Sequence, residues 1–197
     1  GHDGTIFGGM TCDDVGHLGG QSCKFDGKDD YIRITTGPSA PITGTELSVE
    51  FWMKPQSKND GNYHMPISNY PAYQIRYDQN NKFLFGFIYY TDTGGNPKTT
   101  SFADTITQPG ISLWHHVAYT YKEGSPSIVK VYINGVKTSE KTFTGTLGYA
   151  SIFSGLTLGE WYTSSPIAKY YFEGNLDEFK FYDRTLSDAE ILAAASS

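Results

Sequence analysis

The chain has 197 residues, of which 15 are Lys or Arg and 21 are Asp or Glu, so its formal net charge is -6. A chain of this length can bury ~70% of the surface that its unfolded form exposes, so it can build a core without a metal or a disulfide. The excess of acid and the absence of any Lys/Arg run argue against nucleic acid or an anionic membrane surface as the main partner. No apolar stretch of the sequence approaches the ~20 residues that a membrane-spanning helix requires, so we expect no membrane insertion.

The start of the chain indicates that the sequence comes from a longer protein. It begins Gly1-His2-Asp3, with no Met and no signal-peptide pattern. No change of composition and no linker divides residues 1–197. We therefore expect one domain, excised from a larger protein.

Two cysteines, Cys12 and Cys23, lie close together in a Gly-rich polar segment that is typical of a loop. A disulfide between them would close a short ring and contribute on the order of 3 kcal/mol in the chain-entropy model. A metal or redox pair is the alternative, although the sequence has neither a CxxC motif nor a third thiol. A disulfide would favour an extracellular or cell-surface location.

Alternation of polar and apolar residues dominates the chain and predicts β-strands. In 82–90 the alternation puts Phe83, Phe85, Phe87 and Tyr89 on one face. Asn134-Gly135 indicates a tight hairpin, because a type I′ turn needs positive φ at both central residues. We expect strands over 31–35, 48–54, 73–77, 82–90, 115–121, 128–133, 136–143, 155–158 and 176–182.

Only the end of the chain has a helical pattern. The segment from Ser187 to Glu190 is a capping box, and Ile191, Leu192 and an alanine run follow it. Many short antiparallel strands with one terminal helix predict an all-β fold, a two-sheet antiparallel sandwich with a short C-terminal helix.

Three stretches resemble, in order and spacing, the laminin G-like branch of the concanavalin A-like group, which also holds the pentraxins. They are 23–32 followed by 47–55, then 114–121 with 131–135, and finally 172–187 ending in Glu190-Ile191. The resemblance spans 24–191 and implies a jelly roll in which the first and last strands are adjacent. It implies no single activity, because this fold hosts lectins, adhesion modules, glycosidases and structural domains.

The segment Asp26-Gly27-Lys28-Asp29-Asp30 packs carboxylates into a tight turn, where they repel one another unless a cation or backbone N–H groups compensate. Ca²⁺ takes such carboxylate and carbonyl oxygens as ligands. The resemblance places this turn beside the final strand, which implies a structural Ca²⁺ site of Asp26, Asp30 and Asp177. The alternative is that Asp26 and Asp30 cap their own turn.

The sequence gives little support for an enzyme. A glycosidase of this fold needs two suitably spaced carboxylates, and no Glu-x-Asp-x-x-Glu string is present. Neighbouring residues of a strand face opposite ways, so His115 and His116 cannot ligate one metal ion, and we expect both to be structural. His17 and His64 are interpreted as unsupported loop residues. We therefore expect no catalytic residues.

Aromatic residues are abundant where no core demands them. Flat rings with nearby amides and carboxylates suit the apolar C–H face and the hydroxyl edge of a sugar. Two loop regions, 161–171 and 69–73, concentrate such rings, among them the pair Tyr170-Tyr171. The ligand-binding residues that we expect are Trp161, Tyr162, Tyr73, Tyr70, Asn69 and Tyr90.

These patterns together favour a non-catalytic, carbohydrate-binding module of a secreted or cell-surface protein, with a glycan or surface polysaccharide as its partner. The alternative is a protein-binding adhesion module of a cell-surface or pilus protein that uses the same loops. A purely structural spacer is a third reading.

Overall fold

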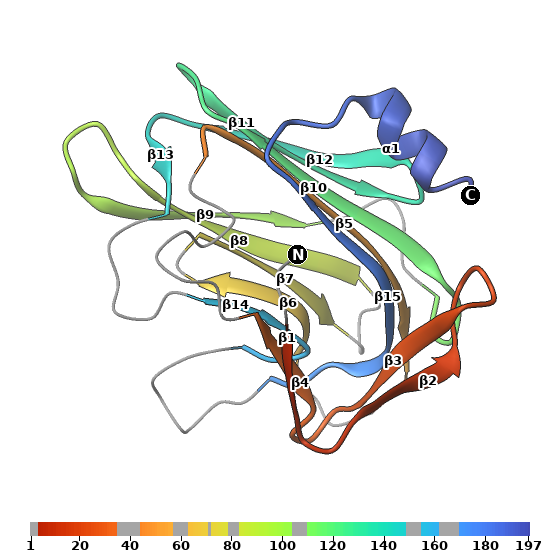
Figure 1. The fold of residues 1–197 in the computed structure, drawn as a ribbon. Coiled ribbons are helices and arrows are strands. Elements are labelled where there is room, and N and C mark those ends of the chain that lie inside the picture. Colours follow the sequence, from red (N-terminus) through yellow and green to blue (C-terminus); the bar gives the residue numbers. More distant parts are fainter. Residues whose placement is uncertain are drawn as a thin grey trace.

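The computed structural model describes residues 4–34, 44–56, 63–70, 72–78, 83–103, 110–148, 155–161 and 170–197. These residues form two antiparallel sheets that pack face to face, with one helix at the C-terminal end (Figure 1). The structure confirms the predicted all-β, two-sheet sandwich with a short C-terminal helix.

Sheet A contains the strands on which the candidate site is built. Its order is β1 (Gly4–Phe7), β4 (Tyr31–Ile34), β14 (Gly155–Leu158), β6 (Tyr63–Tyr70), β7 (Tyr73–Asp78), β8 (Phe83–Thr91) and β13 (Thr146–Leu147), and β9 (Pro97–Ala103) also pairs with β8. Strand β7 therefore lies between β6 and β8.

Sheet B joins the two ends of the chain. Its order is β12 (Val136–Phe143), β11 (Ser127–Ile133), β10 (His115–Lys122), β5 (Glu46–Pro55), β15 (Glu173–Tyr182), β3 (Gln21–Asp26) and β2 (Thr11–Val15). The last strand, β15, pairs with the early strand β3, so the adjacency that the resemblance implied is present.

The core lies between the sheets and is filled by alternate residues of the central strands, as the period of two in a strand dictates. Tyr73 belongs to this core: its side chain is fully buried, and its ring stacks on that of Tyr119 with 4.6 Å between centroids. The expectation that Tyr73 is a loop residue available to a ligand is wrong. Strand β7 is central in its sheet, and Tyr73, Ile75 and Tyr77 all point inward.

The neighbouring strand β8 divides its residues in the same way. Leu84 and Ile88 join the core, whereas Phe87 and Tyr89 contact the outward side chains of β7. The side chains of Phe83 and Phe85 lie outside the described part of the structure.

The predicted hairpin and helix are both present. Asn134 and Gly135 have φ values of 50° and 79° between β11 and β12, as a type I′ turn requires. Helix α1 (Asp188–Ala194) begins at the capping box of Ser187 and Glu190 and buries Ile191 against the outer face of sheet B.

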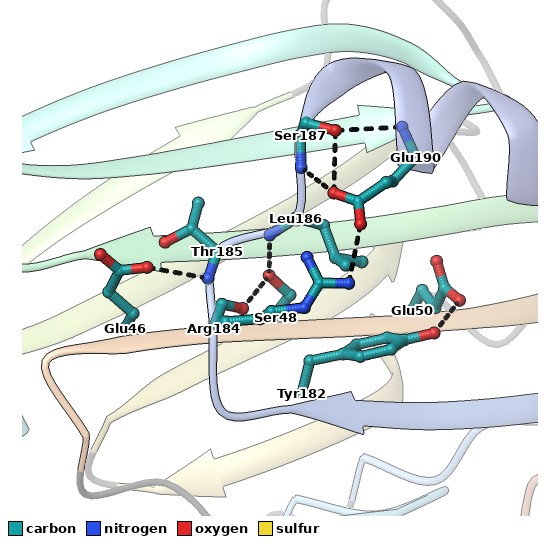
Figure 2. A network of polar contacts seen from close by, with 9 residues as sticks. All are labelled: Glu46, Ser48, Glu50, Tyr182, Arg184, Thr185, Leu186, Ser187 and Glu190. Atoms are coloured by element: carbon teal, nitrogen blue, oxygen red, sulfur yellow. Dashed lines mark hydrogen bonds and ion pairs between the residues drawn. The ribbon is translucent and has the colours of Figure 1, made fainter.

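A polar network fastens the segment before this helix to sheet B (Figure 2). The hydroxyl of Ser48 on β5 donates to the carbonyl of Arg184 at 2.8 Å and accepts the N–H of Leu186 at 2.8 Å. The carboxylate of Glu46 accepts the N–H of Thr185 at 3.1 Å. The C-terminal segment is therefore part of the fold and covers the outer face of sheet B.

Candidate functional site

The outer face of sheet A, which points away from the core, carries a buried arginine. Gln74 and Arg76 alternate with core residues along β7, so their side chains point outward. Arg76 is nevertheless only 9% exposed and Gln74 is fully buried. A buried cation needs partners that replace water, and aromatic rings surround this one.

The guanidinium carbon of Arg76 lies 4.6 Å from the ring centroid of Phe87 and 4.9 Å from that of Trp161. The Tyr170 ring lies 5.9 Å from the same atom and stacks on Trp161, with 5.4 Å between centroids and 12° between planes. Further tyrosines extend this surface, which we name the arginine–aromatic cluster. Its members are Tyr63, Tyr70, Arg76, Phe87, Tyr89, Trp161 and Tyr170.

Hydrogen bonds fix the polar centre of the cluster. Nη2 of Arg76 donates to Oε1 of Gln74 at 2.9 Å, and the Tyr89 hydroxyl donates to the same oxygen at 3.1 Å. The Gln74 amide nitrogen lies 3.5 Å from the hydroxyl of Ser68 on β6. Burial lowers the pKa of Arg76, and the nearby hydroxyls of the cluster partly oppose that shift. The guanidinium stays protonated at neutral pH, because its ordinary pKa exceeds 12.

The rings of the cluster remain accessible. Tyr63 is 40% exposed, and Tyr70, Phe87, Tyr89, Trp161 and Tyr170 are half-buried. Within the described part of the chain, the indole N–H of Trp161 is buried and has no hydrogen-bond partner. The cluster therefore offers flat apolar walls beside a fixed cation, a combination that suits a ligand with apolar C–H faces and hydroxyl groups.

The structure brings together only part of the ligand set expected from sequence. Trp161 and Tyr70 lie in the cluster, whereas Tyr162 lies outside the described residues. Tyr90 instead packs against Phe143 beside the core, with 4.4 Å between ring centroids. Asn69 is buried with 8% exposure on β6. The expectation of one ligand face that includes Tyr73 and Tyr90 is therefore wrong.

Sequence reasoning missed the centre of the site. Neither Arg76 nor Gln74 was among the predicted site residues, although both are polar residues that alternate with apolar ones along the strand. Such a pattern marks one solvent-facing side of a sheet. The sequence alone does not reveal that this side is also covered by Trp161 and Tyr170.

The predicted acidic turn forms a compact group. Ligand oxygens of Asp26, Asp29 and Asp30 lie within 4.8 Å of one another. Oδ2 of Asp30 accepts the N–H of Asp26 at 2.8 Å, and Oδ1 of Asp26 accepts the N–H of Lys28 at 2.8 Å. Burial raises the pKa of Asp30, and repulsion from Asp26 and Asp29 adds to that rise, against the opposing hydrogen bond. Asp26 and Asp30 therefore cap their own turn through hydrogen bonds, as the alternative to a calcium site predicts. The three carboxylates also repel one another, and a bound cation would relieve that repulsion.

Asp177 does not join this group, so the predicted three-residue calcium site is wrong. In the β15–β3 register Asp26 pairs with Glu173, and Asp177 lies four residues further along β15, ~13 Å away at the rise of a strand. Its Oδ2 instead accepts the N–H of His17 at 2.9 Å and fixes the loop between β2 and β3.

The cysteine prediction is confirmed. Cys12 and Cys23 form a disulfide that joins β2 to β3. The neighbouring strands carry both half-buried sulfurs at the edge of the core.

The histidines have structural environments. His115 and His116 are buried on β10, where His115 Nε2 lies 2.9 Å from the carbonyl of Gly110. The interpretation of His64 as a loop residue is wrong. His64 is a buried member of β6, and its Nδ1 lies 2.7 Å from the carbonyl oxygen of Tyr171. His17 is a loop residue, but not an unsupported one, because its ring stacks on Trp52 with 3.4 Å between centroids.

The family of the chain is clear from comparison with known proteins. Residues 26–192 match a laminin G family model described as the concanavalin A-like lectin/glucanases superfamily. The chain therefore belongs to this family. No curated protein matches it at the sequence level.

Several solved structures with the same fold are titled as binding domains. The receptor-binding domain of botulinum neurotoxin C/D mosaic serotype has a TM-score of 0.68 at 15% identity, covering 99% of this chain and 46% of that chain. The binding domain of Paraclostridial Mosquitocidal Protein 1 has a TM-score of 0.70 at 16% identity, covering 98% and 47%. The binding domain of botulinum neurotoxin DC in complex with SialylT has a TM-score of 0.67 at 14% identity, covering 99% and 46%.

At these identities the likeness concerns the fold alone. The chain spans just under half the length of these structures. Among the described residues, no helix has the length and apolar character needed to cross a membrane.

Proposed function

We propose that the chain is a non-catalytic carbohydrate-binding module and that the arginine–aromatic cluster is its ligand site. The observation that carries the proposal is the position of Arg76, whose guanidinium lies within 5 Å of two ring centroids while it hydrogen-bonds Gln74. Sugar rings stack on aromatic walls through their C–H faces, and their hydroxyls accept hydrogen bonds from fixed donors.

Two comparisons support this proposal without extending to the ligand itself. The family is named for lectins as well as glucanases, and several structural neighbours of the chain are titled as binding domains. One of these neighbours was solved with SialylT. For this chain, a glycan or surface polysaccharide is the partner that we propose.

A glycan array tests the proposal and separates it from the adhesion alternative. We expect the parent chain to bind a subset of glycans and Trp161→Ala to lose that binding, because Trp161 supplies one wall of the cluster. Trp114→Ala is the matched control, since Trp114 is also half-buried but lies beside His17 near sheet B. Absence of any glycan signal, with a protein partner lost on Trp161→Ala, would replace this function by protein-binding adhesion.

We also propose that the turn of Asp26, Asp29 and Asp30 holds a structural Ca²⁺ ion. Carboxylate oxygens are the hard ligands that Ca²⁺ prefers. Burial and, after it, repulsion from Asp26 and Asp29 raise the pKa of Asp30, and a cation would offset both effects. A ligand present at a hundredfold excess over its Kd stabilises the native state by about 2.7 kcal/mol.

Thermal melts test the calcium proposal. At about 2–4 °C per kcal/mol for a domain of this size, that stabilisation should raise the Tm by roughly 5–11 °C, and a chelator should reverse it. Asp29→Asn should abolish the shift, whereas Asp13→Asn, an exposed aspartate outside the group, should preserve it. A melting temperature that ignores both Ca²⁺ and chelator contradicts the site.

We propose that residues 1–197 form one domain of a longer extracellular or cell-surface protein. The disulfide supports this location, because such bonds persist in oxidising compartments. Surface labelling of cells that express the native protein tests it.

A further inference from the structure

A cavity of about 160 Å³ lies between the two sheets, on the opposite side of sheet A from the arginine–aromatic cluster, and it opens to solvent. Protein interiors contain few voids larger than a water molecule, so a cavity of this size is an unusual feature of a sandwich core. Most of its wall is apolar. The apolar lining residues are Cys23, Phe25, Ile32, Leu158, Leu176 and Phe179.

Paired residues of neighbouring strands build the two walls of this cavity. Ile32 of β4 pairs with Leu158 of β14 on sheet A, and Cys23 of β3 pairs with Leu176 of β15 on sheet B. The disulfide also holds Cys23 in place. Because strand pairing fixes both walls, the cavity keeps its shape without a ligand.

Two edge strands flank the cavity on the side that solvent reaches. Strand β1 ends sheet A, β2 ends sheet B, and a short turn joins them (Figure 1). Val15 of β2 pairs with the exposed lining residue Gln21 and is itself 77% exposed. Ile6 of β1 pairs with Ile32, so both side chains point to the cavity side of sheet A, yet Ile6 is 49% exposed. Exposed apolar side chains of both edge strands therefore lie beside the cavity.

Among the described residues, no charged group points into the cavity. Asp177 and Glu178 contribute to the lining, but the Asp177 carboxylate accepts the N–H of His17 on the outer face of sheet B. The Glu178 carboxylate lies 3.0 Å from Nζ of Lys180, which pairs in register with Glu50 of the same outer face. A charged ligand group inside the cavity would therefore lose its hydration without gaining a partner of opposite charge.

We propose that this cavity binds an uncharged ligand with one apolar ring, an aryl alcohol being the class that fits it. An engineered cavity of about 150 Å³ lined by Leu, Ile and Phe stays dry and accepts benzene, so the present volume matches one aromatic ring. The ring would lie between the pair Ile32–Leu158 and the pair Cys23–Leu176, and the hydroxyl would stay at the solvent side, near the uncharged amide of Gln21. This site is separate from the arginine–aromatic cluster and does not depend on the function proposed there.

Methyl-resolved NMR of the full chain, with benzyl alcohol as the probe, tests this site. We expect saturable shifts at the methyl groups of Ile32, Leu158 and Leu176, which line the cavity. Benzylammonium and benzoate carry the same ring with a positive or a negative charge, so both should bind more weakly by about tenfold or more. The inference is overturned if benzyl alcohol shifts no cavity methyl, or if either ion binds as well as the alcohol.

Filling the cavity provides the structural control. Leu158→Phe should abolish the shifts, and Ile32→Phe, on the same wall, replaces it if Leu158→Phe fails to fold. Ile34→Phe is the matched control and should bind benzyl alcohol as the parent does, because Ile34 lies two residues away on β4 and does not line the cavity. Unchanged binding in a folded cavity-filling variant, or an equal loss in Ile34→Phe, also overturns the inference.

Discussion

The phenol of Tyr182 on the last strand, β15, donates a hydrogen bond of 2.7 Å to Oε1 of Glu50 on the neighbouring strand β5 (Figure 2). Glu50 is only 3% exposed, and its second oxygen lies 3.5 Å from Nε2 of His116. Burial alone would raise the pKa of Glu50, but the contacts with His116 and Tyr182 hold it below its ordinary value. The ionised carboxylate is therefore part of the folded structure.

Tyr182→Phe should destabilise the fold by about 1.5–3 kcal/mol at pH 7, the usual contribution of a hydrogen bond to a charged group. A carboxyl group whose pKa is lowered by folding stabilises the native state above its unfolded pKa of about 4.3 and loses that contribution as the pH falls through the folded value. The difference between the parent and Tyr182→Phe should therefore stay constant above the ordinary Glu pKa and shrink as the pH falls through the folded value, which a series of urea unfolding curves from pH 7 to pH 2 measures. A difference that is the same over the whole series contradicts this role of Glu50.

Tyr73→Phe should leave stability unchanged or raise it by about 1 kcal/mol. Within the described residues the hydroxyls of Tyr73 and Tyr119 are buried without a hydrogen-bond partner, and removing such a group costs no interaction. Tyr73→Ala should instead cost about 3–5 kcal/mol, because it opens a cavity in the core. Chemical denaturation compares both variants, and a large loss in Tyr73→Phe would reveal a partner for the hydroxyl.

Ser187→Ala should destabilise the chain by about 1 kcal/mol, because it removes the N-cap of α1. Ser196→Ala, at the other end of the helix, is the control and should have a smaller effect. Urea unfolding measures both, and equal losses would show that the capping box does not determine the stability of the helix.

The cap should also resist acid. Hydrogen bonds from Arg184 and Ser187 lower the pKa of Glu190 to about 2. Since the pKa is lowered in the folded state, the contribution of Glu190 persists below the ordinary Glu value and is lost only as the pH falls through about 2. The amide N–H of Ser187, which donates to Glu190, should keep its protection at pH 4 in hydrogen exchange. Loss of protection already at pH 4 contradicts this cap.

Reduction of the Cys12–Cys23 disulfide should lower stability by about 3 kcal/mol, through the loop entropy regained by the unfolded chain. The corresponding decrease in Tm is roughly 6–12 °C for a domain of this size. Melts with and without reductant measure it, and intact mass confirms the redox state. A Tm that is independent of reductant would show that the bond adds nothing to stability.

The elements of the fold could be predicted where a local pattern determines them. Asn134-Gly135 specifies its hairpin because few other pairs reach two positive φ values. Ser187 and Glu190 specify the start of α1 through hydrogen bonds within one turn. Alternation of polar and apolar residues, which is also a local pattern, predicted the strands β5, β8 and β10.

The candidate site depends on long-range pairing, which local patterns do not contain. Alternation in β7 separates Tyr73 and Ile75 from Gln74 and Arg76 and assigns the apolar set to the core, but it does not show which other segments cover the polar set. The distance between Asp26 and Asp177 depends on the β15–β3 register, which no local motif specifies. The contact of Trp161 with Arg76 joins two segments 85 positions apart, as their residue numbers show.

The most direct test of the proposed function is an NMR titration of the parent chain with the oligosaccharides selected by the glycan array. We expect saturable shifts of the Trp161 indole N–H and the Arg76 Nε–H, with a Kd roughly in the upper micromolar to millimolar range for stacking on two rings. The indole signal of Trp114 should stay unchanged. Shifts confined to Trp114 or to the acidic turn, or no shift at millimolar glycan, would contradict a carbohydrate site at the arginine–aromatic cluster.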